Sequence, residues 1–288
     1  MPFPVPPLAC DSHMHVFGAP DRYPGAPGRT YSPSAKSFRE YRSVAGQLRL
    51  QRTVFVQPSA YGTDNRALMD ALGAGDASLR AVAVIDEMYE PATLQRMHEA
   101  GVRGVRLNLL TPRITDTSAA RTILERAAAQ IAPLGWHVQI YGDGEILSAV
   151  APVLPDLPVP VVFDHMGGAR VRSGPDDLGF RTLCGLLAHG HCWAKLSGAD
   201  IVTGNDHDLS GAIVFARALV AANPSRLVWG SDWPHLVHQH AGTGEAAPPA
   251  AYRPVDEAAL LNVLRASVGD EESWRAILVD NPARLYGF

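Results

Sequence analysis

The sequence has little cysteine, no long apolar stretch and no block of like charge. Its three cysteines, Cys10, Cys184 and Cys192, form no CxxC pair, which argues against a disulfide framework or thiolate metal site and for a reducing compartment. No run approaches the roughly 18 apolar residues of a membrane span, and the opening MPFPVPPLACDSH has no basic segment before a long apolar one. We therefore expect a soluble cytoplasmic protein without a membrane partner.

Several classes of binding site are also missing from the sequence. The net charge is −4 over 288 residues with no long run of like charges, which argues against a nucleic-acid footprint. No GxGxxG or P-loop opens a helical segment, and neither a GxSxG motif nor a glycosidase-like carboxylate pair stands out. We expect a small-molecule partner, and the sequence leaves a homodimer open.

What the sequence does contain is an alternation of short apolar, β-branched runs with longer helical patterns. This alternation predicts βα units around a parallel sheet, because each helix must bury an apolar face on that sheet. The eight expected strands are Leu8–His15, Arg52–Gln57, Leu79–Ile85, Val102–Leu107, Trp136–Tyr141, Val159–Asp164, Cys192–Ser197 and Arg226–Ser231. The clearest expected helices are Asp64–Gly73, Pro91–Ala100, Thr117–Leu134 and Leu209–Ala222. Eight units in one domain, residues 1–288, favour an α/β fold of the (β/α)₈ TIM-barrel type over a doubly wound sheet.

Three segments depart from the repeat. Val16–Ser43 and Leu236–Pro254 are long loops that follow the first and the eighth strand. Loops of this length without structure of their own are typical of lids or mobile segments. The last segment, Val255–Phe288, has the pattern of two helices, with Pro282 near the start of the final one.

Polar groups appear where the apolar runs stop. The expected strand ends include HMH, QPS, RLN, IYG, FDH, LSG and GSD. In a TIM barrel the active site lies at the carboxyl ends of the strands. The sequence therefore predicts one polar site assembled from most of the strands.

Three histidines and an aspartate form the expected centre of this site. His13 and His15 are two residues apart on a strand, so their side chains share a face, where they could chelate a metal or polarise a carbonyl. His165 precedes Met-Gly-Gly, and Asp232 at the eighth strand end could be a general base or a metal ligand. Any one of the four could be merely structural, but such a role does not explain the set.

Further polar residues indicate an anionic ligand. Arginine binds carboxylates through a bidentate fork, which makes Arg106 on the fourth strand and Arg113 just beyond it candidate anion ligands. The remaining candidates for substrate contact are Tyr31, Ser59, Tyr141 and His235.

Several stretches resemble a known family. The motifs CDSHMHVFG, VVFDHMGG and WGSDWPH are similar to those of the amidohydrolase superfamily. RYPGAPGRTYSP, QPSAYGTDN and GVRGVRLN resemble its branch of 2-pyrone-4,6-dicarboxylate lactonases and sugar-lactone hydrolases, and the likeness returns at NPARLYGF. The resemblance implies an amidohydrolase-type barrel and an enzyme that hydrolyses a carboxylated lactone, in aromatic or sugar-acid catabolism.

The resemblance also implies roles for the site residues. His13, His15 and His165 would surround the lactone carbonyl oxygen, and Asp232 would activate water. Oxyanion stabilisation with a positioned base is the chemistry that ester hydrolysis needs. The substrate carboxylates or ring would then be held by Arg106, Arg113, Tyr31, Ser59 and Tyr141.

The need for a metal is open at this stage. Zinc members of the superfamily add a histidine at the end of strand five or a carboxylated lysine at the end of strand four or five. This chain has Asn108 and Tyr141 there. We therefore expect metal-independent hydrolysis without a cofactor. The alternative is a Zn²⁺- or Mn²⁺-dependent hydrolase or decarboxylase that binds one ion through His13, His15, His165 and Asp232.

The chain departs from the pyrone-lactonase pattern at two places where arginines are expected. Those places have Gly168 and the stretch Asp200–Gly204, although Arg170 and Arg172 lie near the first. Fewer arginines make a monocarboxylate or sugar lactone a second candidate substrate beside a dicarboxylate. A barrel that binds an anion without turnover is a further alternative, which the complete His/His/His/Asp set disfavours because unused buried polar groups are costly.

Overall fold

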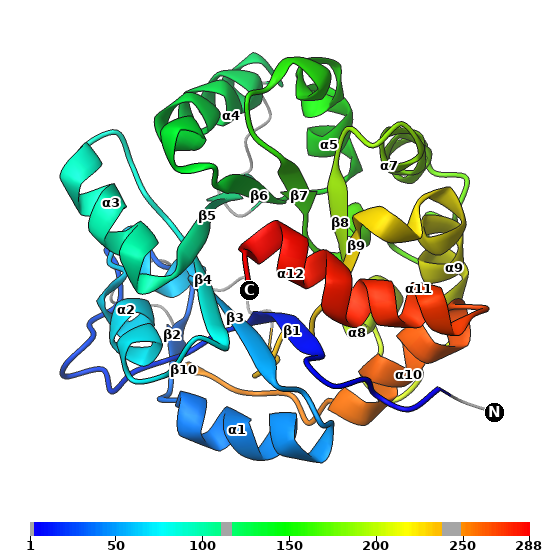
Figure 1. The fold of residues 1–288 in the computed structure, drawn as a ribbon, viewed down its shortest axis with the longest axis horizontal. Helices are drawn as coiled ribbons and strands as arrows, with labels where there is room; N and C mark the ends of the chain where they lie inside the picture. Colours follow the sequence, from blue (N-terminus) through cyan, green and yellow to red (C-terminus); the bar gives the residue numbers. More distant parts are fainter. Residues whose placement is uncertain (1–2, 111–116, 238–248) are drawn as a thin grey trace.

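The computed structural model describes residues 3–110, 117–237 and 249–288, and it confirms the predicted barrel. Eight parallel strands follow one another in chain order around the sheet (Figure 1). They are β1 (Cys10–Met14), β3 (Arg52–Val56), β4 (Leu79–Ala83), β5 (Val102–Asn108), β6 (His137–Tyr141), β7 (Val161–Phe163), β8 (Trp193–Leu196) and β9 (Leu227–Trp229). Each strand falls inside a segment predicted from the alternation, except that β5 extends one residue beyond its predicted end.

The last strand returns to the first and closes the ring. Met14 and Trp233 form a parallel bridge, and the Asp232 amide donates to the His13 carbonyl over 2.8 Å. Gly230 is needed at this closure, because a Cβ there would lie 2.5 Å from the Cβ of His13. Closure therefore brings the carboxyl ends of β1 and β9 into direct contact.

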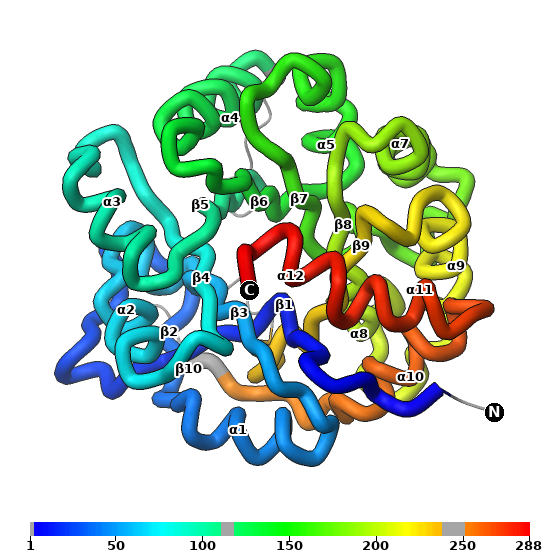
Figure 2. The backbone as a smooth tube through the Cα atoms, viewed as in Figure 1, coloured from blue at the N-terminus to red at the C-terminus, as the bar shows by residue number. Residues whose placement is uncertain are grey.

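The helices surround the sheet, as Figures 1 and 2 show. An apolar stripe on each helix drives this arrangement; in α4, Ala120, Leu124, Ala128 and Ile131 share one buried face. The outer helices are α1 (Phe38–Gln47), α2 (Arg66–Gly73), α3 (Pro91–Ala100), α4 (Thr117–Ile131), α5 (Gly144–Val150), α7 (Leu178–Ala188), α9 (Ala212–Ala222) and α10 (Glu257–Ser267). Two short helices, α6 (His165–Gly168) and α8 (Ala199–Thr203), follow β7 and β8 at the carboxyl end of the barrel.

The described parts of the two long loops contain regular structure that was not predicted. The first one gives way to α1 at Phe38, because Ser37 and Glu40 form a capping box that starts this helix within the expected loop. Each loop also contributes a two-residue strand, β2 (Ser32–Pro33) and β10 (Pro249–Ala250), and these pair in parallel. Backbone hydrogen bonding therefore joins the first loop to the second.

The C-terminal segment closes the opposite end of the barrel. After α10, helix α11 (Glu271–Arg275) continues through a π turn into α12 (Asn281–Tyr286), with Pro282 in its first turn as predicted. Tyr286 is fully buried among residues of β1, β3 and β4. Within the described residues, no helix is long and apolar enough to span a bilayer.

Candidate active site

The four predicted central residues meet at the carboxyl end of the barrel. His13 lies on β1, His15 directly after it, His165 at the start of α6 and Asp232 after β9. The histidines are almost fully buried, and the Asp232 side chain is 13% exposed. The site is therefore a largely dry cluster with its carboxylate at the solvent side.

The three imidazoles converge on one oxygen of Asp232. The Nε2 atoms of His13 and His15 each lie 3.4 Å from Asp232 Oδ1, and Nε2 of His165 lies 3.8 Å from it. Burial alone raises the pKa of Asp232, but the three histidines outweigh it and hold that pKa well below its usual value. Burial lowers the pKa of His13 and of His165. The cluster thus favours an ionised Asp232 carboxylate beside neutral rings at His13 and His165.

An unusual backbone presents His165 to the cluster. The φ angles from His165 to Gly168 are all positive, between 48° and 76°. A Cβ at Gly168 would lie 2.5 Å from the carbonyl oxygen of Gly142. The loop after β6 therefore occupies the space that a side chain at position 168 would need, so an arginine in place of Gly168 would require this loop to move.

A second buried carboxylate, Asp164, lies beneath the histidines. Its Oδ1 is 3.3 Å from His13 Nδ1 and 3.7 Å from Lys195 Nζ, while its Oδ2 accepts hydrogen bonds from Arg106 Nε (3.2 Å) and Gln139 Nε2 (3.0 Å). Burial opposes ionisation, yet His13 and Lys195 together hold the pKa of Asp164 well below its usual value. Asp164 is therefore an anion that links β5, β6, β7 and β8 to β1.

The sequence reasoning missed Asp164, Gln139 and Lys195. One signal was available, because Lys195 is one of only two lysines in the chain and lies inside an apolar strand. It alternates with Ser197, whose hydroxyl lies 3.0 Å from His165 Nδ1, so both point inward. A lysine in such a strand is costly unless it is paired inside the barrel.

The predicted substrate-contact residues form a partial wall. Arg106 is 6% exposed and stacks on the Tyr141 ring at 5.0 Å, while Tyr141 meets His165 edge-on at 5.4 Å between centroids. Ser59 donates a hydrogen bond to the hydroxyl of Tyr31, which lies next to β2. The pairing of β2 with β10 therefore holds Tyr31 near the barrel mouth.

Of the two remaining candidates, one lies outside the described residues and the other does not join this cluster. Arg113 falls outside the described residues. His235 is buried, but Nε2 of its ring lies 3.6 Å from a carboxylate oxygen of Glu257 on α10, and its backbone amide donates to the carbonyl of Asp232. His235 thus supports the turn that carries Asp232.

The donor set would fit a divalent metal. Ligand atoms of His13, His15 and Asp232 lie within 4.8 Å of one another, and those of His13, Asp164 and His165 form a second such group. Nε2 of His13 is buried without a hydrogen-bond partner among the described residues. Imidazole and carboxylate suit Zn²⁺ or Mn²⁺, which would polarise a carbonyl or activate water. The residues that would hold such an ion are His13, His15, His165 and Asp232.

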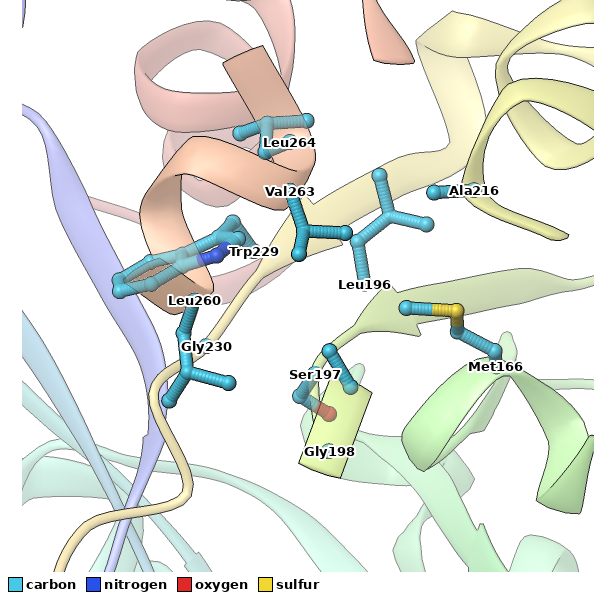
Figure 3. Close-up of a pocket in the computed structure, with 11 residues that line it drawn as sticks. Met166, Leu196, Ser197, Gly198, Ala216, Trp229, Gly230, Leu260, Val263 and Leu264 are labelled. Carbon is cyan, nitrogen blue, oxygen red and sulfur yellow. The ribbon is translucent and has the colours of Figure 1, made fainter. Parts of the chain in front are cut away.

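A small pocket lies behind the cluster, between the ends of β8 and β9 and helix α10 (Figure 3). Its lining is mostly apolar, with Leu196, Trp229, Leu260 and Val263 among the residues that face it. Ser197 and Gly198 form its boundary toward His165. The apolar residues that line the pocket offer no group for acid–base chemistry.

His137, at the start of β6, is a buried histidine whose effect on stability depends on pH. Burial and Lys195 lower its pKa from 6.5 to about 3, and neither ring nitrogen has a hydrogen-bond partner among the described residues. At pH values between the folded and unfolded pKa, His137 binds a proton in the unfolded chain but not in the folded chain. The free energy of unfolding therefore decreases as pH falls, by up to about 1.4 kcal/mol per pH unit.

His137→Phe should remove this contribution while keeping the edge-on contact with Tyr286. We expect its free energy of unfolding, measured with urea, to fall less steeply than that of the wild type between pH 6.5 and 4. Parallel pH profiles for the two proteins would show that His137 has the same pKa in the folded and the unfolded chain.

A family model described as amidohydrolase matches residues 10–288. A 2-pyrone-4,6-dicarboxylate hydrolase of Comamonas testosteroni is 34% identical over 99% of this chain and 92% of its own. A 4-sulfomuconolactone hydrolase of Hydrogenophaga intermedia is 32% identical over 99% and 90%. The crystal structure of a putative 2-pyrone-4,6-dicarboxylic acid hydrolase from Pseudomonas putida is 33% identical, covers 97% of each chain and has a TM-score of 0.75.

The strand order defines a (β/α)₈ barrel, and the named relatives are lactone hydrolases, so the protein is a barrel enzyme of the hydrolase class. The chain belongs to the amidohydrolase family, which confirms the resemblance seen in its motifs.

Proposed function

We propose that this protein hydrolyses a cyclic ester that carries an acidic group. The observation that carries the proposal is the convergence of three imidazole Nε2 atoms on the single oxygen Asp232 Oδ1. A carboxylate kept ionised beside hydrogen-bond donors can take a proton from water while the donors stabilise an oxyanion. The names of the relatives, both hydrolases of anionic lactones, support the same substrate class.

In the proposed reaction, water attacks the lactone carbonyl carbon and gives its proton to Asp232. The carbonyl oxygen becomes an oxyanion that is stabilised by imidazole N–H donors of the cluster. The tetrahedral intermediate then collapses, the ring C–O bond breaks, and the proton passes from Asp232 to the departing ring oxygen. The product is an open-chain acid that carries a hydroxyl or enol.

Arg106 is the proposed anchor for the acidic group of the substrate. It is held by Asp164 on one side and by the Tyr141 ring on the other, which fixes its guanidinium at the edge of the cluster. Tyr31, Ser59 and Arg113 are proposed to contact the rest of the substrate. Hydrolysis of 2-pyrone-4,6-dicarboxylate, 4-sulfomuconolactone and several aldonolactones should be compared by kcat/KM. We expect the acidic lactones to be preferred, and inactivity on every lactone would refute the function.

The alternative of a sugar-acid lactone has its own support. No side chain can be accommodated at Gly168 without moving the loop at Gly142, so an anion-binding arginine is excluded there. An aldonolactone preferred over the dicarboxylate in the same panel would favour this alternative.

We also propose that the reaction does not require a metal. Two buried cations, Arg106 and Lys195, already supply positive charge around Asp164. The ends of β5 and β6 carry Asn108 and Tyr141. We expect turnover to survive prolonged treatment with a chelator, and the purified protein to contain far less than one zinc or manganese per chain. Loss of activity on chelation with recovery on adding Zn²⁺ or Mn²⁺ would establish the metal-dependent alternative.

A further inference from the structure

Lys195 is a charged group that the proposed reaction leaves without a role. It lies within β8 with no exposed surface, and its Nζ donates to Gln139 Oε1 (2.6 Å) and to the carbonyl of Ser12 (2.9 Å). An ammonium has three hydrogens, so one remains. The third contact in hydrogen-bonding geometry is Nδ1 of His13, at 3.5 Å.

This contact determines where the proton of a neutral His13 lies. An ammonium can only donate, so Nδ1 must accept, and the single ring proton is then on Nε2. Asp164 Oδ1 is nearer to Nδ1, at 3.3 Å, and its charge favours a proton there, but an N–H on Nδ1 does not point at this oxygen, which has no hydrogen bond of adequate geometry among the described residues. The geometry of the possible hydrogen bonds therefore favours the Lys195 ammonium over the Asp164 carboxylate as the partner of His13 Nδ1.

His15 has the opposite arrangement. Its Nδ1 lies 2.7 Å from the backbone carbonyl of Val56, which can only accept a hydrogen bond. Nδ1 of His15 therefore carries a proton, and in the neutral ring Nε2 is a lone pair.

We infer that Lys195 is a positioning residue that holds neutral His13 in its Nε2–H tautomer. This rests on the proposed function: the Nε2–H of His13 donates to the lactone carbonyl oxygen, and Asp232 orients the attacking water.

The inference also separates the metal-free reaction from its alternative. A histidine that ligates an ion through Nε2 needs its proton on Nδ1. For His13, Nδ1 would then have to donate a hydrogen bond to Asp164 instead of accepting one from Lys195. A purely structural Lys195–Asp164 ion pair would leave the tautomer of His13 undetermined, so the tautomer itself is the property to measure.

The test is ¹⁵N NMR of protein with labelled histidines, without substrate. The signals of His13 and His15 are assigned by their loss in His13→Gln and in His15→Gln. We expect the Nε2–H pattern for His13 and the Nδ1–H pattern for His15. In Lys195→Met, His13 should change to Nδ1–H, and kcat should fall about 100-fold with KM retained, as for loss of one oxyanion donor.

An Nδ1–H pattern for His13 in the wild type would overturn the inference, even if the enzyme hydrolyses lactones. Lack of lactone turnover would instead overturn the proposed function and leave the spectrum as it is. The matched control is Lys36→Met, because Lys36 pairs with Glu40 at the surface, and it should change neither the spectrum nor kcat. If Lys195→Met does not fold, the wild-type spectrum still decides the tautomer, and Lys195→Arg replaces it as a charge-retaining variant.

Discussion

Asp232→Asn is expected to lower kcat by about 10³- to 10⁴-fold while KM stays within a few-fold of its wild-type value. Asparagine keeps the size and a carbonyl oxygen of the side chain but cannot take a proton from water, so the loss is that of a general base. The backbone should tolerate the change, because Asp232 has a φ of 66° and asparagine is, like aspartate, one of the residues that adopt this conformation. Steady-state kinetics on the best lactone of the panel measures the effect.

The control for this experiment is Asp208→Asn, an exposed aspartate that caps the backbone of Ser210. It should leave kcat unchanged. Thermal unfolding of Asp232→Asn should remain cooperative, which separates a lost base from a lost fold. An Asp232→Asn enzyme that keeps a tenth or more of the wild-type kcat would exclude Asp232 as the water-activating base.

The barrel could be predicted because its signals are local. The helix predicted at Pro91–Ala100 has those bounds in the structure, and the strand predicted at Val102–Leu107 is one residue longer. Each apolar period marks a segment that must be buried, and the parallel order follows from the alternation of strands with helices. The polar strand ends then indicate a common rim, which is where His13, His15, His165 and Asp232 meet.

The pairing of the long loops could not be predicted in the same way. Ser32–Pro33 and Pro249–Ala250 are two-residue strands about 200 residues apart in the chain, too short to show a period of their own. What joins them is the closed barrel, which brings the loops after the first and last strands to neighbouring places on the rim. Tyr31 was therefore predicted as a contact residue without the strand that holds it.

The buried polar residues beneath the histidines could not be predicted from the sequence for a different reason. Lys195 is predictable as a residue of an apolar strand, but whether its charge is tolerated depends on Gln139 and Asp164 of other strands. No spacing along the chain relates these three residues.

Asp164→Asn is the second change with a large expected effect, in this case on stability. The buried Asp164 carboxylate neutralises Arg106 and Lys195, so its loss leaves two uncompensated cations in the barrel interior. Breaking a buried ion pair on one side typically costs about 3–5 kcal/mol. For a chain of this size such a loss lowers Tm by roughly 10 °C. Thermal and urea unfolding give the two values.

The double variant Asp164→Asn/Lys195→Met distinguishes unpaired charge from lost packing. If the cost comes from the uncompensated ammonium, removing it should restore part of the stability, and a double-mutant cycle should give a coupling above about 1 kcal/mol. The matched surface variant, Asp64→Asn, breaks an ion pair with the exposed Arg66 and should leave Tm almost unchanged. Additive effects of Asp164→Asn and Lys195→Met would mean that the two side chains stabilise the barrel independently. Lys195 would then have to be explained by its contacts with Ser12, Gln139 and His13 alone.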